Sequence, residues 1–316
     1  MYWLKLIRWQ NLLIVFLTQL LAWACVILPI KSYSNTPLLL NFTNFMLLSA
    51  STVLIAAAGY IINDYFDIKI DAINRPDKVI LEKQIPLRMA IVMHSLFNIT
   101  AIWFAILVAG HAGRYSWVLL QIGCTILLWL YSTKFKRQFM TGNVVVALLT
   151  GLTIVTLMLY ETAIHHYMLL PAFVETMHGV VPNPAWVLGI YTCFAFSLTW
   201  MREIVKDMED FKGDAEEGCV TMPIKWGLLR SVRFTQALGV LSILPLLIGS
   251  IKLFGAGWWV LGIYTILALA VPIAICIVKL PKTATTQHYH TMSRWLKIIM
   301  VSGIGSLIIY YFQAHA

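Results

Sequence analysis

Charged residues are scarce in this chain of 316 residues. Asp, Glu, Lys and Arg make up only 12% of it, whereas hydrophobic residues make up 60% and the mean hydropathy is +0.79. A soluble globular domain is typically nearer half apolar and a quarter charged. This composition excludes an ordinary soluble domain and indicates an integral membrane protein.

The sequence also lacks a cysteine framework and a signal-peptide cleavage site. No two of its five cysteines lie close together in sequence, so neither a zinc site nor a set of disulfides is recognisable. The first apolar run follows Lys5 and Arg8, as a signal peptide would, but no small-x-small cleavage site stands out after it. We therefore interpret this run as a retained first span.

Long apolar runs separated by short polar segments dominate the chain. A membrane-spanning helix needs about 20 mostly apolar residues, and about nine runs meet that criterion. We therefore predict an all-α, polytopic membrane helix bundle that forms a single domain over residues 1–316. The predicted spans cover residues 11–30, 38–62, 87–109, 115–131, 143–160, 185–204, 234–254, 256–279 and 295–313.

Basic residues are almost absent from one side of this predicted bundle. Of the 23 Lys and Arg residues, only Lys31, Arg114 and Lys252 fall on that side. Cytoplasmic loops carry the excess of basic residues in membrane proteins. We therefore expect the N-terminus in the cytoplasm and the C-terminus outside, in a plasma (inner) membrane. The net charge of +9 then reflects topology, and no nucleic-acid partner is predicted.

The 14 acidic residues include one pattern that occurs twice. Both copies read D-x-x-D-x-x-x-D, and both follow a long apolar run on the predicted cytoplasmic side. Positions i, i+3 and i+7 share one face of a helix, so each copy predicts a stripe of three carboxylates. The first stripe comprises Asp64, Asp67 and Asp71, and the second comprises Asp207, Asp210 and Asp214.

Six carboxylates that converge at a membrane edge would repel one another and resist joint ionisation. A divalent cation removes that conflict, and Mg²⁺ typically binds one or two carboxylates together with substrate phosphates. The two stripes therefore predict a Mg²⁺–diphosphate site, with the six aspartates as catalytic residues and metal ligands. Asn63 precedes the first stripe and is a further candidate for binding the metal and the diphosphate, or for capping the helix.

A leaving diphosphate also needs cations near it. Arg binds phosphate through paired hydrogen bonds and Lys as a point charge, so nearby basic residues are candidates for this role. They are Arg75, Lys136, Arg137, Arg202 and Lys206. The alternative is that these charges only set the membrane topology or contact lipid headgroups. Arg8 and Asn11, at the entrance to the first span, are candidates for binding an acceptor.

These motifs resemble those of the UbiA superfamily of membrane prenyltransferases. The motifs of that family read NDxxDxxxD and DxxxD, and they correspond here to residues 63–71 and 210–214. Arg8-x-x-Asn11 is similar to the N-terminal R-P-x-N of the family, with Trp9 in place of the proline. The resemblance implies a nine-helix bundle and two Mg²⁺ ions that bridge the motifs to an isoprenyl diphosphate.

Within the superfamily, residues 202–214 are most similar to the geranylgeranylglycerol-phosphate geranylgeranyltransferase branch. The resemblance therefore implies prenyl transfer from an isoprenyl diphosphate, geranylgeranyl diphosphate, to a lipophilic acceptor such as geranylgeranylglyceryl phosphate. An aromatic acceptor of quinone biosynthesis, 4-hydroxybenzoate or 1,4-dihydroxy-2-naphthoate, is the alternative within the family. A transporter with an acidic ion site and a polyprenyl-diphosphate phosphatase are alternatives from other classes. Membrane lipids are the other partners expected.

Overall fold

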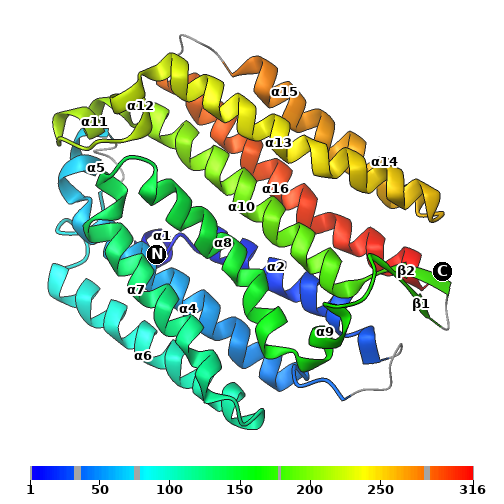
Figure 1. Ribbon diagram of the computed structural model, residues 1–316. Coiled ribbons are helices and arrows are strands. Elements are labelled where there is room, and N and C mark those ends of the chain that lie inside the picture. The colour runs from blue at the N-terminus through cyan, green and yellow to red at the C-terminus, as the bar shows by residue number, and fades with distance from the viewer. Residues whose placement is uncertain (1, 32–36, 75–78, 177–178, 281–284, 316) are drawn as a thin grey trace.

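The computed structural model describes residues 2–31, 37–74, 79–176, 179–280 and 285–315, and this part of the chain is almost entirely helical (Figure 1). The elements before the central hairpin are α1 (Tyr2–Leu6), α2 (Trp9–Ala22), η1 (Trp23–Ile27), α4 (Phe42–Phe66), α5 (Ile68–Asn74), α6 (Leu87–His111), η3 (Tyr115–Val118), α7 (Leu119–Thr133), η4 (Phe135–Arg137), α8 (Thr141–Tyr160) and α9 (Thr162–Tyr167). The elements after it are α10 (Pro184–Glu209), α11 (Phe211–Glu216), α12 (Met222–Trp226), α13 (Leu228–Gly255), α14 (Trp259–Tyr264), η5 (Thr265–Ala270), α15 (Val271–Lys279) and α16 (Thr286–Ala314).

Nine helical segments of the described residues are long and apolar enough to cross a membrane. They match the predicted apolar runs in number and order, which confirms the predicted all-α bundle. The largest difference is the start of the last span, which is Thr286 rather than residue 295. The first two turns of this helix are polar, so hydropathy alone places its start too late.

The spans form two flanks with a central layer between them. Figure 1 shows α4, α6 and α7 on one flank and α13 to α16 on the other, with α2, α8 and α10 between them. Within the first flank α4 packs against α6 and α7, whereas α10 packs against α8, α13 and α16. Helix α2 contacts both α4 and α16 and so joins the two flanks.

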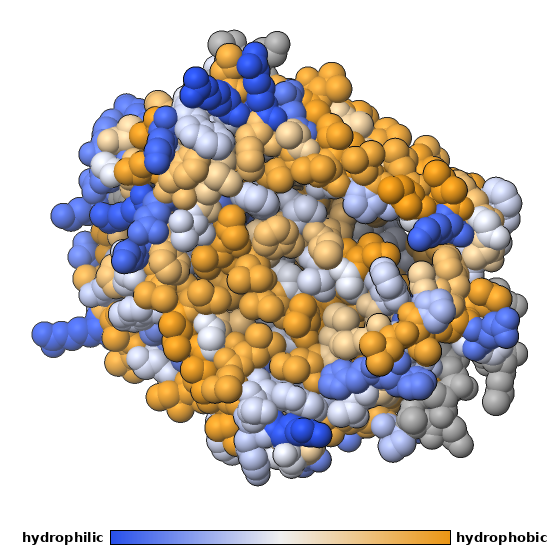
Figure 2. Space-filling view, in the orientation of Figure 1, coloured by the Kyte–Doolittle hydropathy of each residue, from blue (hydrophilic) through white to orange (hydrophobic). Residues whose placement is uncertain are grey.

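Apolar side chains cover most of the outer surface, as expected of a protein whose spans face lipid. Figure 2 shows them over the middle of one face, whereas hydrophilic side chains gather mainly toward the end that carries α5 and α11. Large exposed residues on the spans include Trp103, Leu241, Ile251 and Val278. In water such a surface would be an aggregation site, but in a bilayer it is the expected outer face.

A short β-hairpin at the opposite end of the bundle is absent from the all-α prediction. Strands β1 (Phe173–Thr176) and β2 (Gly179–Pro182) pair antiparallel, with Phe173 opposite Pro182. Figure 1 places the C-terminus beside this hairpin and the N-terminus nearer α5 and α11. The chain therefore begins and ends at opposite ends of the bundle, as an odd number of spans requires.

A buried carboxylate ties the loops together at the hairpin end. Glu161 is fully buried, and its two oxygens accept hydrogen bonds from the backbone N–H groups of Leu39, Leu40 and Ala163 at 3.4, 2.9 and 3.1 Å. These donors belong to the loop before α4 and to the first turn of α9. One side chain therefore satisfies three buried or half-buried backbone N–H groups.

We expect Glu161→Ala to destabilise the bundle by about 2–5 kcal/mol, because it leaves backbone donors unpaired in a buried site. Thermal melting in detergent, followed by circular dichroism, measures the loss. Glu161→Gln keeps one acceptor oxygen and should fall between the wild type and the alanine variant. Glu175→Ala, at an exposed position of β1, is the matched control, and equal melting temperatures for the two alanine variants would contradict this role.

Candidate active site

Each aspartate motif lies where a long spanning helix breaks into a short one. Helix α4 ends just before Asp67 (φ −95°, ψ 1°), and α10 ends just before Asp210 (φ −91°, ψ 9°). The predicted single helical stripe is therefore interrupted at its middle aspartate in both copies. The short helices that follow, α5 and α11, pack against each other and bring the two motifs together.

Both motifs open onto one cavity of about 970 Å³. All six motif aspartates line it, together with residues of α2, α8, α10 and α16. The cavity also extends into the bundle, where its walls include Ile154, Phe194, Val301 and Ile304. It therefore has an acidic mouth and a largely apolar interior, which suits a molecule with an anionic head and a hydrocarbon tail.

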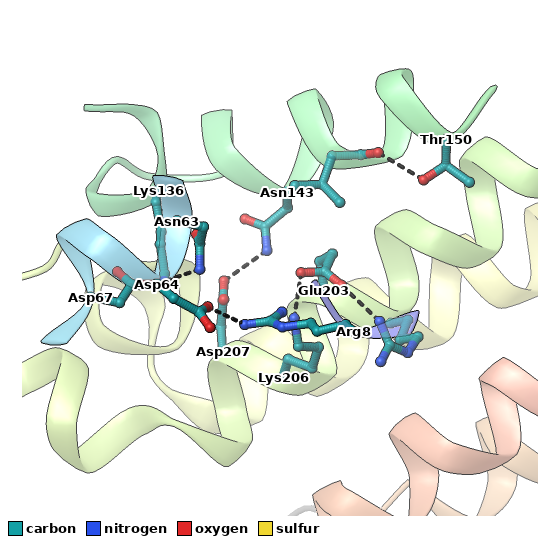
Figure 3. Close-up of polar contacts among 12 residues, drawn as sticks. Arg8, Asn63, Asp64, Asp67, Lys136, Asn143, Thr150, Glu203, Lys206 and Asp207 are labelled. Carbon is teal, nitrogen blue, oxygen red and sulfur yellow. Dashed lines mark hydrogen bonds and ion pairs between the residues drawn. The ribbon is translucent and has the colours of Figure 1, made fainter. Parts of the chain in front are cut away.

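The first motif is held by two basic residues from distant parts of the chain. The Arg8 guanidinium donates to Asp64 Oδ1 at 2.7 Å, and the Lys136 ammonium donates to the nearly buried carboxylate of Asp67 (Figure 3). Burial alone would lower the pKa of Lys136, but the charge and hydrogen bond of Asp67, together with smaller contributions from Tyr131 and Asp71, raise that pKa above its ordinary value. Burial and the neighbouring Asp67 charge also raise the pKa of Asp71.

The second motif lines the same cavity as the first and also has one buried aspartate. Asn143 donates to Asp207 Oδ2 at 2.8 Å, and Asp214 is only 6% exposed (Figure 3). Burial raises the pKa of Asp214 to about 6; Lys136 opposes the rise, and the Asp210 and Asp67 charges add to it. Because one of these charges belongs to the other motif, the two motifs share one electrostatic environment.

The residues present fit a hard divalent cation. The donors are carboxylate oxygens and one amide, Asn63, which Mg²⁺ prefers over nitrogen or sulfur. Asn63 donates to Asp67 at 2.7 Å, and its own Oδ1 is buried without a hydrogen-bond partner in the described structure. No three His, Cys, Asp or Glu side chains of the described residues converge into a preformed metal centre. This arrangement matches a metal completed by substrate phosphates rather than by protein alone.

Not every predicted basic residue contacts an aspartate of the acidic mouth. Lys136 does, whereas Arg202 and Lys206 line the cavity but both pair with Glu203, at 3.0 and 2.9 Å. The Lys206 charge also acts on Asp214. Arg137 does not line the cavity, and its carbonyl accepts a backbone hydrogen bond from Val220. Arg75 lies outside the described residues.

The two candidate acceptor residues also line the cavity. Arg8 adopts a left-handed conformation (φ 51°) before α2 and reaches Asp64, while Asn11 accepts a hydrogen bond from Lys297 Nζ at 2.6 Å. Arg8 therefore contacts the first aspartate motif, and Asn11 contacts the last helix, α16. The two residues join the N-terminal segment to both walls of the cavity.

The sequence prediction did not assign three polar residues that line the cavity: Asn143, Glu203 and Lys297. Glu203 and Lys297 lie within spans, where ionisable residues are rare and usually functional. An ionisable residue inside an apolar run is visible in the sequence, so Glu203 and Lys297 could have been found from it. Asn143 follows Gly142, whose added Cβ would lie 2.9 Å from the Lys136 Cα. Gly142 thus permits the close packing that places Lys136 beside α8.

Comparison with known proteins places this chain in one family. The UbiA prenyltransferase family model matches residues 20–297. A digeranylgeranylglyceryl phosphate synthase of Methanococcus aeolicus is 29% identical over 84% of both chains. The synthase of that name from Methanothermobacter thermautotrophicus is 33% identical over 81% of this chain and 82% of its own.

Solved structures share the same fold. A digeranylgeranylglyceryl phosphate synthase structure matches with a TM-score of 0.68 and 23% identity, covering 99% of this chain and 98% of its own. A UbiA homologue from Archaeoglobus fulgidus, bound to DMAPP and Mg²⁺, matches with a TM-score of 0.58 and 14% identity over 98% and 99% of the two chains. With nine candidate spans among the described residues and a family match across most of its length, this multi-pass membrane protein belongs to the UbiA prenyltransferase family.

Proposed function

We propose that this protein transfers a geranylgeranyl group from geranylgeranyl diphosphate to geranylgeranylglyceryl phosphate in a Mg²⁺-dependent reaction. The observation that carries the proposal is that both aspartate motifs open onto one cavity with an apolar interior. The relatives at 29% and 33% identity, both named digeranylgeranylglyceryl phosphate synthase, support this acceptor. The homologue bound to DMAPP and Mg²⁺ supports the donor class and the metal.

The acidic mouth suits the diphosphate end of the donor. Two Mg²⁺ ions, held by the motif aspartates and Asn63, would neutralise the diphosphate and make it a better leaving group. Lys136 adds a fixed positive charge beside Asp67. In the reaction the donor C1–O bond breaks, the acceptor hydroxyl forms an ether bond to C1, and a proton and diphosphate are released. The apolar interior excludes water, which would otherwise capture the allylic cation.

We expect purified protein to form the ether product from geranylgeranyl diphosphate and geranylgeranylglyceryl phosphate only when Mg²⁺ is present. EDTA should abolish turnover and Mg²⁺ should restore it, because the six aspartates cannot hold a diphosphate without cations. Product analysis by mass spectrometry measures the outcome. Full activity in excess EDTA would remove the metal from the mechanism.

The same assay separates the other functions. Products formed only with 4-hydroxybenzoate or 1,4-dihydroxy-2-naphthoate would move the protein to quinone biosynthesis. Release of phosphate and a free prenyl compound without any acceptor product would indicate a phosphatase. No conversion of any of these substrates would leave the transporter as the better explanation.

The two motifs should act as one site. Asp67→Asn and Asp210→Asn remove one charge from each motif, and each should reduce turnover by about a hundredfold or more, by analogy with other groups that stabilise transition-state charge. The double variant should lose little beyond either single variant, because residues that act as a unit are far from additive. Prenyl-transfer rates at saturating Mg²⁺ test this expectation.

Two controls accompany these variants. Glu216→Gln removes an exposed charge from α11 that does not line the cavity, and it should keep wild-type turnover. Melting temperatures in detergent show whether each variant is folded. Near-normal turnover for one aspartate variant, with the other inactive, would show that only one motif serves the chemistry.

We also propose that the acidic mouth faces the cytoplasm and that the C-terminus lies outside, in a plasma membrane. All but three of the 23 Lys and Arg residues belong to the predicted cytoplasmic side. Reporter fusions at the C-terminus and in the segment between α11 and α12 should therefore report opposite sides. Signals from the same side would contradict the proposed topology.

A further inference from the structure

Beside the acidic mouth, two basic side chains share one carboxylate and a third donates to an amide. Arg202 and Lys206 both pair with Glu203, while Lys297 donates to the neutral amide of Asn11. All these residues line the cavity. This part of the cavity therefore carries an excess of positive charge within membrane-spanning helices, where unpaired charges are costly.

The donors of this basic cluster (Arg202, Lys206 and Lys297) are not fully used within the protein. The Arg202 Nε is buried without a hydrogen-bond partner in the described structure. The Arg202 guanidinium and the Lys297 ammonium also repel each other electrostatically. An anion bound between them would satisfy the free donor and relieve the repulsion. The charge excess suits a dianion, which is the main state of a phosphate monoester near pH 7.

Arg8 lies between the first aspartate motif and Glu203, whereas Lys206 is next to Asp207 in sequence and its charge also acts on Asp214. The Arg8 guanidinium pairs with Asp64 at 2.7 Å, and its charge also acts on Glu203 (Figure 3). The aspartates need metal ions to hold an anion, whereas the side of the cavity that carries Arg202 and Lys297 does not, and Lys206 lies between the two. Two anionic substrates would then have adjacent but distinct binding sites.

We propose that Arg202, Lys206 and Lys297 bind the phosphate monoester of the acceptor lipid, rather than the donor diphosphate predicted for Arg202 and Lys206 from the sequence. The inference rests on the proposed function and adds a location for the acceptor headgroup. In geranylgeranylglyceryl phosphate, the free hydroxyl is on the carbon next to the one that bears the phosphate. Binding the phosphate beside the acidic mouth therefore places this hydroxyl close to the donor.

Removing the Lys297 charge tests the proposal. In Lys297→Gln, the KM for geranylgeranylglyceryl phosphate should rise about tenfold or more, as expected when a charge-assisted hydrogen bond is lost. The KM for geranylgeranyl diphosphate should not change. The preference for this acceptor over dephosphorylated geranylgeranylglycerol should shrink by a similar factor. Lys297→Arg keeps the charge and should keep the preference.

Binding measured without turnover separates this inference from the proposed function. Geranylgeranylglyceryl phosphate is titrated into donor-free protein in EDTA, and tryptophan fluorescence or thermal stabilisation reports binding. The wild type and Lys297→Arg should bind, Lys297→Gln should bind about tenfold more weakly, and the dephosphorylated lipid should bind equally to all three. Lys252→Gln, an exposed position of α13 outside the cavity, is the matched control and should bind like the wild type.

Three results would overturn the proposal. Equal binding to the wild type and Lys297→Gln would do so while leaving the proposed function intact. An increase in the KM for geranylgeranyl diphosphate alone would assign the cluster to the donor. Failure of the wild type both to bind and to prenylate the phosphate lipid would overturn the inference and the proposed acceptor together. Should Lys297→Gln fail to fold, Arg202→Gln removes a second charge of the same cluster, and the same results are expected of it.

Discussion

The repulsion among six carboxylates around one cavity is the constraint on which the rest of the structure depends. Each aspartate lies at the end of an apolar helix or just beyond it, so water is a weaker screen there than at an ordinary protein surface. The protein itself compensates part of this repulsion: Arg8 and Lys136 form ion pairs with aspartates, and the amide of Asn143 donates a hydrogen bond to a third aspartate. Burial, with smaller contributions from the Asp210 and Asp67 charges, still raises the pKa of Asp214 to about 6. Such a site suits a metal–diphosphate complex, as proposed above, better than either partner alone.

The fold brings the six carboxylates together by repeating one structural feature, a break between a spanning helix and a short helix. In both halves, a spanning helix ends one residue before the middle aspartate, and a short helix continues from it. The two short helices then pack against each other. Because the break recurs at the same place in the motif, equivalent carboxylates from the two halves are presented to the same cavity. Gly142 completes the arrangement, since a larger residue there would push Lys136 away from α8.

Much of this could be predicted from the sequence because the signals are local. Long apolar runs define the spans, and the aspartate spacing defines the acidic mouth, so both predictions need only neighbouring residues. The residues at which helices begin and end are harder to predict. The polar first turns of α16 carry no hydropathy signal, although they belong to the same continuous helix as the span.

The partners of the aspartates could not be predicted in the same way. Lys136 and Arg137 are adjacent in sequence, yet only Lys136 lines the cavity. Which of the two does so depends on how the short η4 turn sits against α8, and no spacing rule encodes that packing. Lys297 meets Asn11 across 286 positions of sequence, because α16 and α2 are neighbours in the bundle. Such contacts follow from the rotation of each helix about its axis, which hydrophobic patterning specifies only coarsely when both faces of a span are apolar.

Under the proposed function, the cavity must bind two anionic lipids, the donor and the acceptor, at the same time. The distribution of charge in the cavity suggests how it does so. Two anions in one uniformly basic cavity would compete for the same donors, and two in an acidic cavity would both need metal ions. Here Arg8 pairs with Asp64, and Glu203 binds Arg202 and Lys206 on the other side. Glu203 is one charge against two, and Arg8 and Lys136 are two charges against the three aspartates of the first motif, so each part keeps an excess of its own sign. A diphosphate that arrives with its cations is electrostatically suited to the acidic part, whereas a bare phosphate is repelled from it. The order and orientation of the two substrates can then follow from charge alone, before any contact with their hydrocarbon tails is made.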